Sequence, residues 1–173
     1  MGKFVLGAKR PLIIAGPCSA ETREQTVETA MQLARSGRVD VIRAGVWKPR
    51  TQPGTFEGVG EPALEWLNEV KAATGLPIAV EVANRAHVEC ALRHGVDLLW
   101  IGARTTVSPF AVQEIAESLR GNKDVAVLIK NPMVPDINLW AGAVNRLIKE
   151  GIPAENIGLI HRGFSYFGRS KYR

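Results

Sequence analysis

The chain has 173 residues, of which 46% are apolar and 23% charged, and its formal net charge is +5. This length suits one domain with a sizeable core and is too short for two ordinary domains. The apolar runs are strand-sized, which excludes a membrane-spanning helix. Residues 1–10 lack the apolar core of a signal peptide, so we expect a cytoplasmic protein. The chain has two cysteines, Cys18 and Cys90, which are too few for a disulfide framework. Each could be a metal ligand or a buried thiol.

Short β-rich runs alternate with helical stretches along the whole chain. In chain order we expect a strand over Pro11–Ala15, a helix over Thr22–Ser36, a strand over Val39–Ala44, a helix over Pro62–Thr74, a strand over Pro77–Val82, a helix over Arg85–His94, a strand over Val96–Gly102, a helix over Pro109–Arg120, a strand over Val125–Lys130, a helix over Leu139–Glu150 and a strand over Ile157–Arg162. Most of the strands are nearly continuous apolar runs, which is typical of sheets covered on both faces. A glycine follows each helix, where a left-handed residue commonly ends helices; these are Gly37, Gly75, Gly95, Gly121 and Gly151.

Repeated strand–helix units predict an α/β fold with a parallel sheet and right-handed crossovers. A doubly wound open sheet and a closed (β/α)8 TIM barrel both satisfy this pattern. The first strand is not followed by a Gly-rich dinucleotide-binding motif, and polar or charged residues end strand after strand, which favours the barrel. A complete barrel typically needs about 250 residues. We therefore predict a single, incomplete barrel domain over residues 1–173, with about six β/α units and a terminal loop over Gly163–Arg173.

The segment from Ile42 to Thr51, at the end of the second predicted strand, holds three cations, Arg43, Lys48 and Arg50, and leads into a Gly/Pro-rich stretch over residues 52–60. Such a loop can bring a guanidinium, an ammonium, a hydroxyl and backbone amides to one phosphorylated ligand. A surface loop with scattered charges fits the composition equally well.

A further cation, Arg104, follows the apolar run of the fourth predicted strand. An arginine at the tip of a buried strand needs an anionic partner, which is either a ligand or a protein carboxylate. Glu81 and Asp136 are the protein carboxylates that we consider, and an internal ion pair is the commoner arrangement for an isolated arginine.

Three more residues sit at strand ends. Lys130 could form a Schiff base, bind phosphate or protonate carbon, or it could be an idle rim lysine. His161 could carry a proton, bind a metal or be a satisfied core imidazole, the last being the commoner case. Cys18 could be a nucleophile, a soft metal ligand or, most commonly, an inert thiol. The chain has no CxxC pair, which argues against a closed structural zinc site.

Together these signals point to one mouth of the barrel. The basic residues form no continuous run, so a small anionic ligand suits them better than a nucleic acid. So many cations are unfavourable in one place unless anions neutralise them, and we therefore expect substrates rich in phosphate. The converging residues are Cys18, Arg43, Lys48, Arg50, Arg104, Lys130, His161 and Arg162.

Five motifs at the strand ends carry a resemblance to a known family. They are Gly16-Pro17-Cys18-Ser19-Ala20-Glu21, Lys48-Pro49-Arg50-Thr51, Gly102-Ala103-Arg104-Thr105-Thr106, Lys130-Asn131-Pro132 and His161-Arg162-Gly163. In this order they resemble the type I 3-deoxy-D-arabino-heptulosonate-7-phosphate (DAHP) synthases, most of all the compact microbial branch, over essentially the whole chain. The related 3-deoxy-D-manno-octulosonate-8-phosphate synthases carry a Lys-Ala-Asn-Arg-Ser type motif in place of the second one.

The resemblance implies a transferase of the shikimate pathway to aromatic amino acids, which condenses phosphoenolpyruvate with erythrose 4-phosphate and releases phosphate. It implies that Arg50 and Thr51 hold the phosphate of erythrose 4-phosphate. We expect Lys48, Lys130 and His161 to be catalytic, with Lys130 or His161 handling protons. The phosphoenolpyruvate ligands would be Arg43, Lys48, Arg104, Lys130 and Arg162.

The resemblance also implies a divalent metal ion (Mn, Fe, Zn or Co) with four ligands, one of which would be Cys18. The family's other ligands are a His, a Glu and an Asp from later strands, and no residue of this chain matches them. We further expect a homo-oligomer that binds neither nucleic acid nor membrane. The alternatives are the sister synthase and a non-catalytic fragment that binds phosphorylated ligands.

Overall fold

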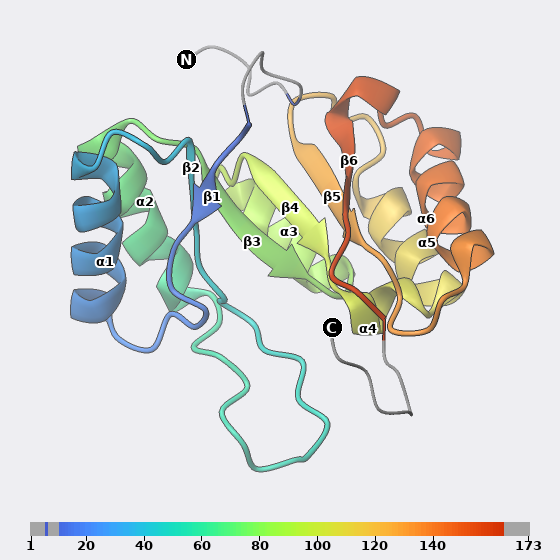
Figure 1. Ribbon diagram of the computed structural model, residues 1–173, viewed down its shortest axis with the longest axis horizontal. Coiled ribbons are helices and arrows are strands. Elements are labelled where there is room, and N and C mark those ends of the chain that lie inside the picture. Colours follow the sequence, from blue (N-terminus) through green and yellow to red (C-terminus); the bar gives the residue numbers. More distant parts are fainter. Residues whose placement is uncertain (1–5, 7–10, 165–173) are drawn as a thin grey trace.

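A computed structural model describes Leu6 and residues 11–164. Within these residues, six strands form one sheet in the order β1-β2-β3-β4-β5-β6, and every neighbouring pair is parallel. Each new strand is therefore added on the same side of the previous one (Figure 1). The strands are β1 (Ile14–Ala15), β2 (Val41–Arg43), β3 (Ile78–Val82), β4 (Leu98–Ile101), β5 (Ala126–Lys130) and β6 (Ile157–Ile160).

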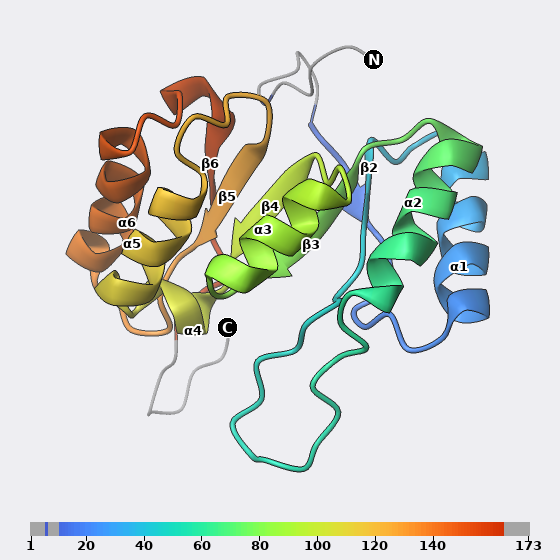
Figure 2. The ribbon, with the colours of Figure 1, turned by 180° about the vertical axis from the view of Figure 1, so that it is seen from behind.

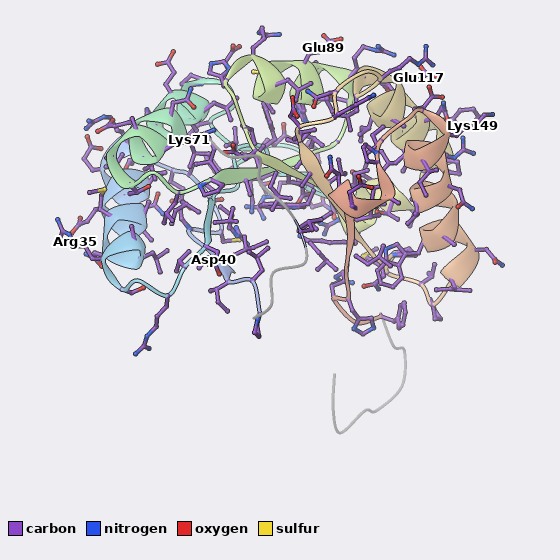
Figure 3. The ribbon with its side chains drawn as sticks, turned by 90° about the horizontal axis from the view of Figure 1, so that it is seen from above. Arg35, Asp40, Lys71, Glu89, Glu117 and Lys149 are labelled. Atoms are coloured by element: carbon purple, nitrogen blue, oxygen red, sulfur yellow. The ribbon has the colours of Figure 1, made fainter. Side chains whose placement is uncertain are left out.

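The helices cover one face of the sheet. They are α1 (Arg23–Arg35), α2 (Pro62–Thr74), α3 (Arg85–Arg93), α4 (Ala103–Thr106), α5 (Pro109–Ser118) and α6 (Ile137–Lys149), with a 3-10 turn η1 (Ala154–Asn156) before β6. Helix α3 lies in front of β3 and β4 when the molecule is seen from behind (Figure 2). Seen from above, the helices form an arch around the curled sheet (Figure 3).

This arrangement decides between the two predicted architectures, the doubly wound sheet and the barrel. A doubly wound sheet reverses its strand order and carries helices on both faces. Sequential parallel strands with helices on the outer face alone form the wall of a β/α barrel. The six strands form a curled part of a (β/α)8 barrel, and the predicted fold class is confirmed.

Two apolar layers lie on the two faces of the sheet, because successive side chains of a strand point to opposite faces. Between sheet and helices the core includes Ile42 and Leu99, whereas their neighbours Val41 and Leu98 belong to a smaller inner cluster. Trp100, from β4, also belongs to the inner cluster. Burial on both faces explains why the strands are nearly continuous apolar runs.

Side-chain caps set where several helices begin. Thr22, Ser108 and Asp136 each accept a backbone N–H from the first turn of α1, α5 and α6, respectively. The cap at Asp136 starts α6 at Ile137, two residues before the predicted start at Leu139. All five predicted helices are present, and the glycine after each has a positive φ, as predicted.

The strands are shorter than the apolar runs that predicted them. The residues predicted to begin the first strand, from Pro11 to Ile13, lie outside β1, and His161 and Arg162 follow β6 rather than ending it. Helix α4 was not predicted, because four residues carry too little periodicity to be recognised. Gly163 and Phe164 lack regular structure, and the rest of the predicted terminal loop lies outside the described residues. None of the described helices is long and apolar enough to cross a membrane.

Candidate functional site

The carboxyl ends of the six parallel strands meet at one edge of the sheet. The connections that leave this edge include the long loop between β2 and α2, the short helix α4, and the segment between β5 and α6, all at the lower edge of Figure 1. Barrel active sites are built from such connections, so the predicted site residues are described from this edge.

The indole ring of Trp100 is the meeting point of two predicted cations. The guanidinium carbon of Arg43, from β2, lies 5.5 Å from the ring centroid, and Nζ of Lys130, from β5, lies 5.2 Å from it. Cations within about 6 Å of an indole are attracted by its π face. Side chains that are 87 residues apart in sequence are thus brought to one ring.

The carboxylate of Glu81 lies beside these cations. From the sequence it was considered only as a partner for Arg104. Glu81, from β3, accepts a hydrogen bond of 2.7 Å from Trp100 Nε1, and its Oε2 lies 3.6 Å from Lys130 Nζ. Gly102 makes room for it, since a Cβ at that position would lie 2.2 Å from Glu81 Oε1. The signal that could have revealed this role is a single carboxylate in the middle of an apolar strand, where a charge needs a partner.

The loop after β1 packs against residues that follow β2. Arg43 donates to the carbonyl of Pro17 at 2.9 Å, and Lys48 Nζ lies 2.8 Å from the carbonyl oxygen and 3.3 Å from Sγ of Cys18. Gly16, at φ 153°, permits the close approach, because a Cβ there would lie 1.9 Å from the carbonyl oxygen of Arg43. The hydrogen bond and the charge of Lys48, with a smaller effect of Arg43, lower the pKa of the exposed Cys18 thiol.

The long loop between β2 and α2 is closed at its base by backbone hydrogen bonds. The amide of Lys48 donates to Glu57 at 2.8 Å, and that of Gly60 donates to Val46 at 3.1 Å. Arg50 Nε donates to the carbonyl of Phe56 at 2.9 Å, and Arg50 and Thr51 are both exposed at the edge. The predicted cationic loop therefore exists as an ordered unit; we refer to residues 46–60 as the β2 loop.

A cavity of about 370 Å³ lies between the β2 loop and the end of β3. Three charged residues of the loop, Lys48, Arg50 and Glu57, and Glu81 of β3 contribute to its lining, which gives it both signs of charge. The full lining is Trp47, Lys48, Pro49, Arg50, Glu57, Glu81, Val82, Ala83 and His87.

His87 of α3 also lines this cavity. It was not predicted from the sequence. Its ring stacks on Trp47 with centroids 4.2 Å apart and planes 8° from parallel, and its Nδ1 accepts the Ala83 N–H at 3.3 Å. Burial lowers the pKa of His87, which favours the neutral imidazole. At the start of a helix this histidine carries no sequence signal, since its partner Trp47 is forty residues away.

Arg104 lies in α4 rather than at the tip of β4. It is exposed, and its Nη1 donates to the carbonyl of Pro49 in the β2 loop at 3.4 Å. Neither carboxylate proposed as a protein partner fills that role in the described structure: Glu81 bonds Trp100 and Asp136 caps α6. The internal ion pair was therefore the wrong alternative.

His161 and Arg162 are exposed after β6 and lie beside the end of β5. The buried Asn131, next to Lys130, accepts the amide of Arg162 at 2.7 Å and donates to the carbonyl of Gly163 at 2.9 Å. The His161 ring meets Phe164 edge-on at 5.6 Å, so the alternative of a core imidazole is wrong. Among the contacts described, neither side chain reaches Arg43 or Lys48.

The described residues do not complete a metal site around Cys18. Within that part of the chain, the one group of three metal-ligating side chains with atoms within 4.8 Å of one another is Glu61, Cys90 and His94, in the outer helical layer. Cys18 instead has Lys48 Nζ, a cation, at 3.3 Å from its sulfur. The neighbours of Cys18 among the described residues therefore do not fit a metal ion.

Comparisons with solved structures agree with the fold. The crystal structure of a phospho-2-dehydro-3-deoxyheptonate aldolase (DAHP synthase) from Thermotoga maritima superposes with a TM-score of 0.78 at 28% identity, covering 96% of this chain and 48% of that one. A truncated form of 3-deoxy-D-arabino-heptulosonate 7-phosphate synthase from the same organism gives 0.74 at 26% identity, covering 96% of this chain and 60% of that one.

Comparisons with curated proteins point the same way. A phospho-2-dehydro-3-deoxyheptonate aldolase of Thermotoga maritima is 39% identical over 104 residues, which are 60% of this chain and 30% of that protein. A 2-dehydro-3-deoxyphosphooctonate aldolase of Methylobacillus flagellatus is 36% identical over 92 residues, or 49% of this chain and 33% of that protein. The matches thus span about a third of these curated relatives. A family model, described as the DAHP synthetase I family, matches residues 3–173, and the chain belongs to that family.

Proposed function

We propose that this chain is the larger part of a barrel that condenses phosphoenolpyruvate with erythrose 4-phosphate to give DAHP and inorganic phosphate. The observation that carries the proposal is the convergence of Arg43 and Lys130 on the Trp100 ring, at 5.5 and 5.2 Å. Cations gathered from separate strands need anions to neutralise them, and both substrates carry phosphate.

Phosphoenolpyruvate would bind deep in the site, and erythrose 4-phosphate near the β2 loop. Arg50 and Thr51, exposed on that loop, would bind the phosphate of the sugar. The phosphate and carboxylate of phosphoenolpyruvate would be held by Arg43, Lys48, Arg104, Lys130 and Arg162. Holding two mutually repelling anions in a reactive arrangement would supply most of the rate enhancement, through proximity and preorganised charge.

We propose an aldol-like reaction in which the bonds change in the following order. C3 of phosphoenolpyruvate attacks the aldehyde carbon, positive charge develops at C2, and water adds there. The resulting hemiketal phosphate then loses inorganic phosphate by C–O cleavage. Lys130 is our candidate for the proton carrier, because Glu81 lies 3.6 Å away and can balance its charge; His161, exposed at the end of β6, is the alternative.

The acceptor sugar distinguishes the proposal from its nearest alternative. The Methylobacillus relative is named a 2-dehydro-3-deoxyphosphooctonate aldolase, which points to a sister synthase. Lys48-Pro49-Arg50-Thr51 favours erythrose 4-phosphate instead. Phosphate release from phosphoenolpyruvate, measured with a panel of phosphorylated aldoses, decides between them; release with arabinose 5-phosphate in preference to erythrose 4-phosphate would favour the sister activity. We also propose a cytoplasmic homo-oligomer that does not bind nucleic acid.

Phosphoenolpyruvate affinity is the direct test of the site, because binding can be measured by calorimetry without turnover. Lys48→Ala and Arg104→Ala should each weaken binding by about ten- to a hundredfold, as expected when a charged hydrogen bond is lost. Arg23→Ala is the matched control, since Arg23 pairs with Glu69 on the helical surface at 2.6 Å. Unchanged affinity in the Lys48 and Arg104 variants would remove these residues from the site.

A further inference from the structure

A second cluster of ligand-type side chains lies in the outer helical layer. Glu61 is the residue before α2, and Cys90 and His94 lie on and just after α3. The thiol is buried, the imidazole is 18% exposed and the carboxylate is 54% exposed. The three groups thus form a path from the core to the surface, separate from the cations at the strand ends.

The spacing of these groups is that of a metal site. Cys90 and His94 are one helical turn apart and share a face. Their ligand atoms and a carboxylate oxygen of Glu61 all lie within 4.8 Å of one another. In a tetrahedral zinc site with bonds of 2.0–2.3 Å, ligand atoms are about 3.3 to 3.8 Å apart, so small side-chain rotations would close the distance.

The imidazole of His94 lies between the other two groups, with its Nδ1 3.9 Å from Cys90 Sγ. Its Nδ1 lies 2.9 Å from the backbone carbonyl of Cys90, and its Nε2 lies 3.8 Å from Glu61 Oε1. A hydrogen bond from one ring nitrogen to a backbone carbonyl fixes the tautomer that leaves the other nitrogen free as a ligand, an arrangement found in most histidine metal sites. The same contact to the carbonyl of Cys90 caps the last turn of α3, where His94 is the C-cap residue.

We propose that Glu61, Cys90 and His94 bind a borderline-soft divalent cation of the zinc type, with water as the fourth ligand. Sulfur, imidazole nitrogen and carboxylate oxygen form a donor set that suits zinc. On binding, the Cys90 thiol releases its proton to solvent and its sulfur bonds the metal without redox change. Thiolate and carboxylate together balance the two charges of the ion.

The site has one competitor and one structural consequence. The guanidinium of Arg93 lies 3.4 Å from Glu61 Oε1 and has to give up this contact when a metal binds. A bound ion would tie Glu61, the residue that follows the β2 loop, to α3, the helix that carries His87. It would act as a clamp on the wall of the cavity, and its existence does not depend on the proposed catalytic function.

Cobalt(II) is the probe that tests the proposal, because a thiolate ligand gives it a charge-transfer absorption band. The titration uses the Cys18→Ser variant, which lacks the other thiol. The protein is kept reduced and free of metal before Co2+ is added. We expect one Co2+ per chain, a thiolate band, and displacement of the band by Zn2+. No band, or a band that appears only when Cys18 is present, would overturn the proposal.

Three variants in the Cys18→Ser background locate the ligands. Cys90→Ala should abolish the band, and His94→Gln should weaken Co2+ binding by roughly a hundredfold, at least as much as the loss of a supporting outer group. His161→Gln is the matched control and should bind as before. If circular dichroism shows that Cys90→Ala does not fold, His94→Gln still tests the proposal. Unchanged Co2+ affinity in His94→Gln would reject the site.

Arg93→Ala tests the site through an expected increase in Co2+ affinity, whereas the ligand variants should decrease it. Removing the competing guanidinium should tighten Co2+ binding, whereas a cluster that serves only helix packing would show no metal dependence. Weaker binding in this variant would contradict the proposed geometry. Phosphoenolpyruvate affinity, measured in parallel, shows separately whether the cation-lined site is intact.

Discussion

At the scale of single residues, Trp100 and Glu81 organise the charges of the candidate site. The indole N–H is satisfied by Glu81 at 2.7 Å, and the same carboxylate lies 3.6 Å from Lys130 Nζ. Both charged side chains are more than two thirds buried, so removing either one leaves the other in a poorly solvated place. Two variants at Glu81 can separate the hydrogen bond from the charge.

We expect Glu81→Ala to lower the free energy of unfolding by about 1–3 kcal/mol, the usual cost of a buried donor left without an acceptor. Glu81→Gln should cost less, because its amide oxygen can still accept the Trp100 N–H. Urea unfolding measures both, with Glu69→Ala as the control on the exposed pair with Arg23. Equal losses in the two Glu81 variants would mean that the charge, and not the hydrogen bond, stabilises this site.

The reactivity of Cys18 should depend on Lys48. Thiolate is the form that alkylates, and Lys48 lowers the pKa of the Cys18 thiol. The midpoint of the alkylation rate against pH should therefore lie below that of an ordinary thiol and should move to higher pH in Lys48→Ala. The rate of iodoacetamide modification in a Cys90→Ala background measures the shift, and Lys71→Ala, which removes the distant partner of Asp97, should leave the midpoint in place.

At the scale of elements, the sequence predicts helices better than it predicts the site. Helix α2 starts and ends as predicted, because Pro62 and Gly75 mark its two ends unambiguously. A strand buried on both faces gives no such information about which side chains face inward. The inward direction of Trp100, and hence its contact with Glu81, could not be predicted from an apolar run.

The displacement of Arg104 has a similar cause. The residue was predicted at the tip of a strand, but Gly102 is the N-cap of a four-residue helix, α4, and the exposed Arg104 lies within that helix. Two cations that are themselves the last residues of strands, Arg43 in β2 and Lys130 in β5, lie close to their predicted positions. Thus the sequence predicts which strand end a residue occupies, while short local turns decide where its side chain lies.

Two glycines should respond oppositely to alanine. Gly142 lies inside α6 with nothing within 4 Å of an added Cβ, so Gly142→Ala should stabilise the protein by about 0.5–1 kcal/mol. Gly102→Ala should destabilise it, by about 1–3 kcal/mol as for other overpacked sites, because the new Cβ would lie 2.2 Å from Glu81 Oε1. Thermal and urea unfolding compare them, and stabilisation by Gly102→Ala would show that Glu81 can move without cost.

At the scale of the whole molecule, the sheet is an arch whose end strands, β1 and β6, are each paired on one side among the described residues. Leu159 of β6 is 57% exposed. An edge strand with an exposed apolar side chain invites pairing with another chain. The 173-residue chain is therefore expected to self-associate through this edge.

Leu159→Lys should lower that self-association, because a charge on an edge strand opposes strand pairing. Sedimentation velocity over a range of protein concentrations measures the effect. Ile148→Lys is the matched control: Ile148 is 46% exposed but lies on α6, away from the strand edge. If both variants associate like the parent chain, the edge of β6 is not the contact.

The closed base of the β2 loop has a consequence for how this family can vary. Backbone bonds from Lys48 to Glu57 and from Gly60 to Val46 fasten the two legs of the loop, so the stretch between Thr51 and Thr55 is held from below. Extra residues inserted at that tip would cost little, since doubling a flexible segment adds only about 0.6 kcal/mol of closure entropy. Such insertions could therefore change the residues that lie over the proposed sugar-binding side while the barrel wall stays unchanged.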